Sequence, residues 1–468
     1  MNQLYVYNHC VSTTISEPRA RRKQLVLLTC SLSLLIVSMD ATIVNVALPS
    51  IRTDMAASVQ QLQWVVDVYT LTLAGLLVLA GAAADRFGRR RVFRIGLIAF
   101  AVGSLLCSVA PTVGVLIAAR FTQAVGGSML NPVAMSIITA TFTGRAERAR
   151  AIGVWGAVVG ISTALGPLVG GILIESLGWR SVFWINLPIC ALAVVLTFLV
   201  VPESKAARIR PVDPWGLVLA VAVVFTLVFG LIEEQPLVFL GTVAALAAFV
   251  LHERRHPSPF LDLRFFRSIP FSAATLTAVC AFAAFGAFLF TMSVYLQETR
   301  HLSAVHAGLM FLPMALAVLI CSPISGRLVA SYGARPSLLG AGLLMTTGAV
   351  LLTAIHPDTP LPLIAVIFAI FGTGFGLVNA PITNSAVNGM PLDRAGAAAA
   401  LASTSRQVGV SIGVALAGLS AGAQLWWIVA GTTSCVLALG VVSTGPAAAR
   451  SIERIAPLLE DREGADAR

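Results

Sequence analysis

Four ionisable residues stand out because each lies within a long apolar segment: the acids Asp40 and Asp67 and the arginines Arg120 and Arg406. A charge in such a segment is costly unless it is paired, hydrated or neutralised. A carboxyl group can be neutralised by a proton, whereas arginine stays charged when it is buried. An acid beside a fixed cation can therefore take up a proton and release it when its surroundings change. We predict that Asp40 and Arg120 couple proton movement; the alternative for Asp40 is a purely structural hydrogen-bonding role.

Three of these residues are expected at a similar depth in the membrane. At ~1.5 Å of helix per residue, Asp67 and Arg120 come to about 10 Å, and Asp40 to about 13 Å, below one surface. A cluster of the three is therefore feasible. A structural role for Asp67, as a partner of Arg120, is one of the two predictions for this residue. For Arg406 a structural role and a role in transport are equally supported.

The elements that must position these residues are long hydrophobic helices. Of 468 residues, 57% are hydrophobic and 11% are charged, with a mean hydropathy of +0.89, whereas a soluble chain carries about 25% charged residues. Apolar runs of about 20 residues span a bilayer, and backbone groups in lipid must be bonded within a helix. The expected fold class is an all-α integral membrane protein. We predict fourteen transmembrane helices, at approximately 25–50, 61–84, 92–110, 113–141, 149–174, 181–201, 214–232, 236–252, 270–296, 304–329, 337–355, 361–386, 395–420 and 425–444.

The spans are expected to form two six-helix halves that are separated by an inserted pair of helices. A faint repeat supports a duplication, because Gly, an aromatic residue, Gly and Arg recur at matching offsets in Gly81–Arg90 and Gly326–Arg335. Transporters are often built from duplicated halves with the substrate site between them. The expected divisions are an N-terminal tail (1–24), a first half (25–201), a linker with the two inserted helices (202–269), a second half (270–444) and a C-terminal tail (445–468).

The basic residues predict the orientation of the chain in the membrane. Of 31 Lys and Arg residues, 26 fall on the side of the two termini, and the opposite loops hold only Arg52, Arg180 and Arg300. Cytoplasmic loops carry this excess, so both termini are expected in the cytoplasm, at the cytoplasmic membrane. The same clustering in short loops argues against nucleic acid as the reason for the net charge of +10.

The seven cysteines are dispersed without metal-ligand or redox spacing, and His301 and His306 stand alone. The phosphate-binding pattern Gly-x-x-x-x-Gly-Lys-Ser/Thr does not occur in the sequence. We therefore expect no metal, no cofactor, no use of ATP and no enzymatic activity. The expected partners at this point are protons and the lipid bilayer, and we expect a monomer.

A glycine-rich basic loop follows the second predicted span. Gly81 and Gly88 permit a close approach and a tight turn, and Asp85 can cap a helix or pair with an arginine such as Arg86 or Arg89. The spacing of Gly81, Asp85, Arg86, Gly88 and Arg89 matches the pattern Gly-x-x-x-Asp-Arg-x-Gly-Arg-Arg.

Three further segments have recognisable patterns. Asp40 is followed by Thr, Asn45 and a terminal Pro, and Arg120 is followed by Gln123 at the third position, although the glycines beyond it are shifted. Small residues recur at close intervals in the fifth span. Such spacing lets helices pack closely, and a Gly-Pro pair interrupts the helical hydrogen bonds. The residues of this third pattern are Gly156, Gly160, Gly166, Pro167 and Gly170.

Together these patterns resemble the major facilitator superfamily, specifically its fourteen-helix drug:proton antiporter branch. The resemblance implies the major facilitator fold and alternating access. It implies a latch in the glycine-rich loop that favours the outward-facing state, and a fifth-helix motif that is associated with export. We predict that Asp67, Asn45, Gln123 and Arg406 contact the substrate.

The spans hold two central acids and two arginines, which favours neutral or monocationic amphiphiles, or a mildly acidic natural product, over dications. A proton-driven exporter of one endogenous metabolite is the alternative function. A set of aromatic side chains could supply stacking surface for the substrate or pack against lipid: Phe282, Phe285, Phe288, Phe290 and Phe371.

Overall fold

The computed structural model describes residues 17–205, 213–256, 259–388, 395–419, 422–448, 450, 451 and 454. Within these ranges the regular elements are all helical. The predicted N-terminal tail lies outside the described residues up to residue 16, as does most of the predicted C-terminal tail. The first helices are α2 (Glu17–Met55), α3 (Val59–Phe87), α4 (Arg89–Ser108), α5 (Val113–Thr141), α6 (Arg145–Leu177), α7 (Ser181–Trp184) and α8 (Asn186–Val200).

The second part of the chain holds the remaining helices, including a 3₁₀ turn (η1) and a π-helical turn (η2). Each of the fourteen predicted spans overlaps one of the helices or a broken pair of them. The remaining elements are α9 (Pro214–Ile232), α10 (Val238–Arg255), η1 (Leu263–Arg267), α11 (Ile269–Val294), η2 (Tyr295–Thr299), α12 (Ala304–Met310), α13 (Leu312–Tyr332), α14 (Ala334–Leu352), α15 (Leu361–Val387), α16 (Ala395–Leu419) and α17 (Ala423–Val442).

By length and composition, eleven of the described helical segments could cross a membrane, or twelve if the bent helix α6 counts as one span. The prediction of fourteen spans is therefore supported only in its coarser form, a multi-pass helical protein. The two predicted spans that do not meet this criterion correspond to α10 and α16, in which polar residues interrupt the apolar sequence. α10 ends in Glu253, Arg254 and Arg255, and α16 carries Arg406 among serines and threonines.

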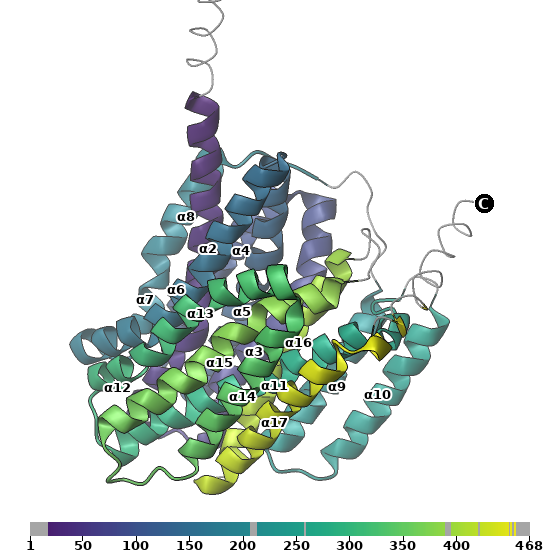
Figure 1. The fold of residues 1–468 in the computed structure, drawn as a ribbon. Coiled ribbons are helices and arrows are strands. Elements are labelled where there is room, and N and C mark those ends of the chain that lie inside the picture. Colours follow the sequence, from purple (N-terminus) through teal and green to yellow (C-terminus); the bar gives the residue numbers. More distant parts are fainter. Residues whose placement is uncertain are drawn as a thin grey trace, which may run out of the picture.

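The helices pack in two bundles that lie side by side (Figure 1). In the first, α2 packs on α5, α6 and α8, and α5 packs on α3 and α4. In the second, α11 packs on α16 and α17, and α15 packs on α13 and α14. Each bundle has its own large cluster of buried apolar side chains. The bundles meet where α3 contacts α16, α2 contacts α11, and α6 contacts α12 and α13.

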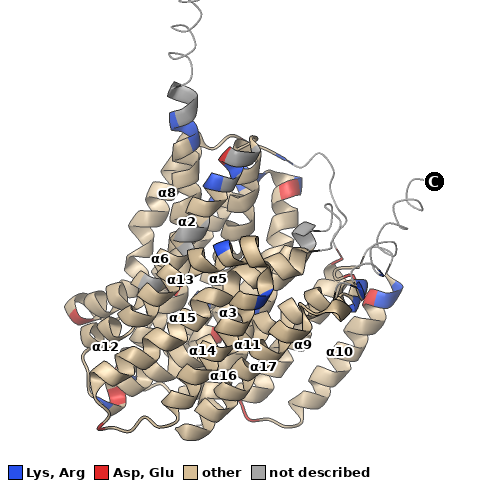
Figure 2. Cartoon of the chain, in the orientation of Figure 1, with Lys and Arg blue, Asp and Glu red and all other residues tan. Residues whose placement is uncertain are grey.

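The α9–α10 pair lies at one flank, where α9 packs on α3 of the first bundle and on α16 of the second (Figure 1). Helix α2 begins eight residues before the predicted span and extends beyond the bundle (Figure 1). Most of the Lys and Arg residues visible in Figure 2 lie toward the end of the molecule where α2 begins and α10 ends.

Close packing between α2 and α6 depends on two glycines of the fifth-span motif. A Cβ on Gly166 would lie 3.0 Å from Cβ of Thr42, and one on Gly170 would lie 2.6 Å from Cγ1 of Ile43. Any larger residue would push the helices apart, so these positions hold α6 against the helix that carries Asp40. Gly160 is less constrained, at 3.8 Å from Leu319. The side-chain surroundings of Gly156 lie outside the described residues.

Candidate functional site

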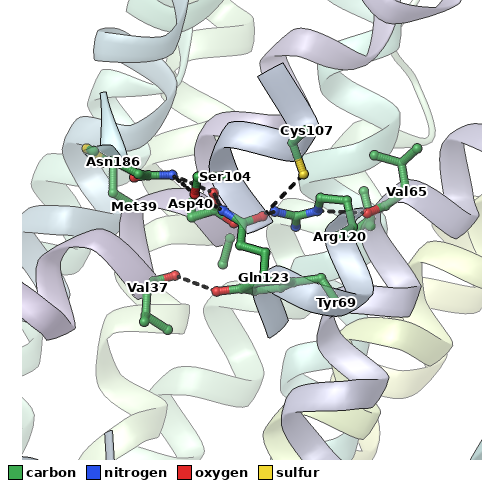
Figure 3. Close-up of polar contacts among 12 residues, drawn as sticks. Val37, Met39, Asp40, Val65, Tyr69, Ser104, Cys107, Arg120, Gln123 and Asn186 are labelled. Carbon is green, nitrogen blue, oxygen red and sulfur yellow. Dashed lines mark hydrogen bonds and ion pairs between the residues drawn. The ribbon is translucent and has the colours of Figure 1, made fainter. Parts of the chain in front are cut away.

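Asp40 and Arg120 form a completely buried ion pair inside the first bundle (Figure 3). Nη1 of Arg120 on α5 donates to Oδ2 of Asp40 on α2. Oδ1 of Asp40 accepts hydrogen bonds from Nε2 of Gln123 at 2.8 Å and from Nδ2 of Asn186 on α8 at 3.1 Å. All three partners of the carboxylate are donors. The site therefore requires a group that accepts hydrogen bonds on both oxygens.

The guanidinium of Arg120 is enclosed as well as paired. Its Nε donates to the carbonyl of Val65 at 3.1 Å, and its Nη1 also donates to Oε1 of Gln123 at 2.7 Å. The ring of Tyr69 lies 4.1 Å and that of Phe183 5.9 Å from its central carbon, and aromatic faces attract a cation. The charge of Arg120 is thus balanced by one carboxylate, two acceptors and two aromatic rings.

The structure brings together residues that the sequence analysis treated separately. Gln123, which we predicted to contact the substrate, instead bridges Asp40, Arg120 and the hydroxyl of Ser104. Asn186 was not predicted as a site residue. It lies on α8, and its signal in the sequence was an asparagine at the start of a long apolar segment.

Asp67 does not join this cluster, so the predicted grouping of Asp40, Asp67 and Arg120 is wrong. Val65 and Tyr69, four residues apart on α3, face Arg120. A residue midway between them points to the opposite side of the helix, because each residue advances the helix by 100°. A similar depth in the membrane was the basis of the prediction, but depth does not determine the direction of the side chain. Asp67 is therefore not a partner of Arg120, and that interpretation is wrong as well.

Asp67 instead lies at the interface between the bundles. Its Oδ1 accepts a 3.4 Å hydrogen bond from Thr70, whose hydroxyl is 2.5 Å from that of Ser411 on α16. Its Oδ2 is buried and has no hydrogen-bond partner among the described residues. Unlike Asp40, Asp67 forms no ion pair within the described part of the chain.

A cavity of about 140 Å³ lies between the bundles, lined by residues of α2, α3, α5, α6, α11 and α16. Asn45, which we predicted to contact the substrate, lines it together with Thr70, Asn131 and Gln407. The side-chain oxygens of Asn45 and Asn131 are buried without hydrogen-bond partners among the described residues. Unused acceptors beside a cavity can bind a donor on a ligand.

The aromatic residues divide between the cavity and the core. Phe282 and Phe285 line the cavity, and Phe285 stacks on Phe375 with centroids 4.1 Å apart. Phe288 and Phe371 also stack, but in the core of the second bundle. Phe290 is buried too, in a cluster shared by the two bundles. Packing against lipid is thus the wrong interpretation for these five side chains.

Arg406 has a polar and an aromatic neighbour. Its Nη2 donates to Thr383 at 2.5 Å, and its guanidinium lies 5.9 Å from the ring of Phe282, which lines the cavity. Arg406 itself is not among the lining residues. No acid forms an ion pair with it within the described ranges.

The comparisons with known proteins assign this architecture to a family. The family model of the Major Facilitator Superfamily matches residues 30–414. The chain belongs to the Major Facilitator Superfamily. It is 38% identical over 408 residues to the multidrug resistance protein Stp of Mycobacterium tuberculosis, covering 85% of this chain and 76% of that protein. It is 33% identical over 404 residues to the tetracenomycin C resistance and export protein of Streptomyces glaucescens, covering 84% and 75%.

Among solved structures, the chain is similar to a D-xylose–proton symporter, with a TM-score of 0.65 over 89% of this chain and 96% of that one. At 16% sequence identity this likeness concerns the fold alone. It agrees with the two-bundle arrangement described above.

In this superfamily member the two bundles are fastened together at the end away from the start of α2. Arg52 at the end of α2 forms an ion pair of 2.7 Å with Glu298 of η2. Gln297 donates to the carbonyl of Val46 at 3.0 Å, and Gln63 on α3 donates to the carbonyl of Val414 on α16 at 2.7 Å. These contacts join α2 and α3 of the first bundle to η2 and α16 of the second.

The glycine-rich loop of the superfamily pattern lies at the opposite end. Gly88 has φ of +108° between α3 and α4, a backbone conformation that favours glycine. Asp85 pairs with Arg89 at 3.0 Å within the first bundle. The backbone amide of Arg90 donates to Glu203 at 3.1 Å, an acceptor that we did not predict.

The other two residues of the pattern make simpler contacts. Arg86 lies over the ring of Phe87 at 5.5 Å, and a Cβ on Gly81 would be an ordinary 3.8 Å from Pro132.

Proposed function

We propose that this protein is a proton-coupled antiporter that exports amphipathic small molecules, neutral or monocationic, from the cytoplasm. The observation that carries the proposal is the buried pair of Asp40 and Arg120 within one of two bundles that enclose a cavity between them. Relatives whose names record multidrug resistance and antibiotic export support the direction and the class of substrate. The proposal includes fourteen membrane spans, two six-helix halves with an inserted pair, and cytoplasmic termini in the cytoplasmic membrane. It also includes a monomeric state.

The proposed proton step centres on Asp40. Protonation of its carboxyl would remove the charge that balances Arg120 and would turn one of its two acceptor oxygens into a donor, facing either Arg120 at Oδ2 or Gln123 and Asn186 at Oδ1. Since Gln123 and Asn186 connect this carboxyl to α5 and α8, a change in its charge alters contacts between helices of the first bundle. Movement of this bundle relative to the second is the alternating-access step.

The proposed substrate site is the cavity between the bundles. Asn45 and Gln407 would hold polar groups of the substrate, and the rings of Phe282 and Phe285 would hold its apolar part. Asp67 lies beside Thr70 at the edge of this cavity and would meet a single positive charge. No acid is among the described residues that line the cavity, which favours a neutral or monocationic compound over a dication.

The contacts at Arg52 and Gln297 correspond, with cytoplasmic termini, to a state closed toward the outside. In that state the pair of Asp85 and Arg89 stays within the first bundle. We propose that the glycine-rich loop forms its latch to the second bundle in the opposite, outward-facing state.

A second candidate function is export of one metabolite. The observation that favours it is the set of amide side chains, Asn45, Asn131 and Gln407, around a small cavity. Buried amides discriminate strongly against molecules that leave them without partners. Such a site suits one hydrogen-bonding compound better than a range of unrelated drugs.

The experiment is proton-gradient collapse in everted membrane vesicles, followed with a pH-sensitive dye while a panel of amphiphiles is added. The wild type is expected to dissipate the gradient with particular compounds, and Asp40→Asn is expected to abolish that response. Asp54→Asn is the matched control, because it makes the same carboxylate-to-amide change at an exposed position. A full response from Asp40→Asn would refute the proposal, and a response to one metabolite only would select the second candidate.

A further inference from the structure

A cluster of ionisable side chains lies outside the site described above, at one end of the α9–α10 pair. Asp213 is the residue before α9, while His252 lies in the last turn of α10 and His256 directly follows it. Because α9 and α10 run in opposite directions, the start of one and the end of the other meet. The two histidines are four residues apart, which places them on the same side of the helix.

The ligand atoms of these three residues converge. Nε2 of His252 lies 2.9 Å from Oδ2 of Asp213, and Nδ1 of His256 lies 3.7 Å from the same oxygen. All three ligand atoms lie within 4.8 Å of one another. In a tetrahedral zinc site with bonds of about 2.0–2.1 Å, neighbouring ligand atoms are roughly 3.4 Å apart. The distances of 2.9 Å and 3.7 Å from Oδ2 of Asp213 to the two imidazole nitrogens lie on either side of that value.

A fourth polar group provides an independent observation. Glu253 is 4% exposed, and its Oε1 is buried without a hydrogen-bond partner among the described residues. A Cβ on Gly216 would lie 2.5 Å from this oxygen and 2.5 Å from Oδ2 of Asp213. Both carboxylates therefore reach the same small space over Gly216, and only glycine leaves that space free.

A helix cap with a hydrogen bond to histidine explains only part of this arrangement. Oδ1 of Asp213 accepts the hydrogen bond from the backbone amide of Gly216 at 2.9 Å and so caps α9. Oδ2 faces two imidazole nitrogens, of which Nε2 of His252 also lies 3.1 Å from Oδ1, and the buried oxygen of Glu253 is close by. Two carboxylates placed so near each other are stabilised by a cation, and two imidazole nitrogens with carboxylate oxygens are ligands that zinc binds.

We propose that Asp213, His252 and His256 form a zinc-binding site, with Oε1 of Glu253 at the fourth position. The site does not depend on the proposed transport function. It would fasten the start of α9 to the end of α10. Since α9 contacts α3 and α16, it would stabilise a helix pair that touches both bundles.

The site was not expected from the sequence, although His-Glu-Arg-Arg-His has the spacing of a helical zinc-binding pair. In metalloproteases the Glu of that spacing acts as the general base. Here Oε2 of Glu253 accepts the backbone amide of Leu261 at 3.0 Å, and the third ligand is an N-capping Asp. We assign the site a structural role, in which zinc holds the helix ends together.

The test uses the full-length protein in detergent, purified with a tag that contains no histidine. After equilibration with zinc and removal of the excess, elemental analysis is expected to find one zinc ion per chain in the wild type. Competition with a fluorescent zinc chelator then gives the affinity. His252→Ala and Asp213→Asn are each expected to weaken zinc binding at least tenfold, and zinc is expected to raise the melting temperature of the wild type only.

His356→Ala is the matched control, because it removes an exposed histidine elsewhere in the chain and should bind zinc as the wild type does. Asp213→Asn keeps an oxygen that can cap α9, so it tests the ligand even if the histidine variants fold poorly. Zinc binding of equal affinity and stoichiometry in the wild type and in Asp213→Asn would overturn the proposal. A wild type that retains no zinc above the level of His252→Ala would overturn it too.

Discussion

Asp40→Asn and Arg120→Met should destabilise the protein unequally, although each removes one half of the same ion pair. Asp40 and Arg120 are 0% and 1% exposed. Removing one partner of a buried pair typically costs about 3–5 kcal/mol, because the other charge stays buried without compensation. Arginine cannot lose its charge, whereas a carboxyl can take up a proton. Asp40→Asn should therefore reach the upper part of that range and Arg120→Met should cost less.

The hydrogen bonds of Asp40 add to this difference. Its oxygens accept from Arg120 on one side and from Gln123 and Asn186 on the other. An amide at this position has one oxygen and one NH₂ group, so in either orientation a donor faces a donor. The double variant Asp40→Asn/Arg120→Met removes both charges. It should be more stable than Asp40→Asn alone, since no charge is then left buried without compensation.

The assay is the apparent melting temperature of the detergent-solubilised protein, followed by fluorescence-detected size exclusion. The expected order of stability places the wild type first and Asp40→Asn last, with Arg120→Met and the double variant between them. Asp358→Asn, at an exposed acid, serves as the control for the carboxylate-to-amide change. The reasoning is refuted if Asp40→Asn melts at the wild-type temperature, or if Arg120→Met is the less stable single variant.

Two further predictions concern the end of the molecule where the bundles are fastened. Glu298→Gln removes the ion pair with Arg52. Because both side chains are partly exposed, the closed state should lose at most about 1 kcal/mol of stabilisation, which shifts the equilibrium about fivefold toward the other state. The shift is measurable as increased labelling of a cysteine placed in the cavity. Equal labelling in both proteins would contradict this. Hydrogen bonds from Trp179 and Arg180 lower the pKa of Asp54 in the folded protein. The ionised carboxylate therefore contributes to stability above a pH of about 4, and this contribution is lost as the pH falls through the lowered pKa. The wild type should melt above Asp54→Asn at pH 7, and this difference should shrink at pH 3; a difference independent of pH would exclude the interaction.

Helix position and depth were largely predictable from the sequence. Apolar length predicts where helices begin and end within a few residues, and the failures have physical causes. Helix α2 begins eight residues before the predicted span because a helix can continue past the membrane through basic residues such as Arg21 and Arg22. The similar depth of Asp40 and Arg120 was also predictable, since helical rise per residue is constant.

The direction of side chains and the partners contributed by distant segments were not predictable in this way. Asp67 has the depth of Arg120 but faces α16, because its neighbours two residues away on either side occupy the face toward Arg120. Gln123 was predicted to contact the substrate. Its hydrogen bond to Asp40, on another helix, could not be predicted from the pattern around Arg120.

The sequence by itself determined that this protein lies in a lipid bilayer and is helical, which superfamily pattern it carries, and which residues bring charge into the apolar segments. These follow from local composition and spacing, which act over one or two helical turns. Only the tertiary structure decided that Asn186 completes the Asp40 site, that Asp67 belongs to the bundle interface, and that Asp213 meets His252. Each of these contacts joins different helices, and the packing of those helices depends on the shapes of all their faces together.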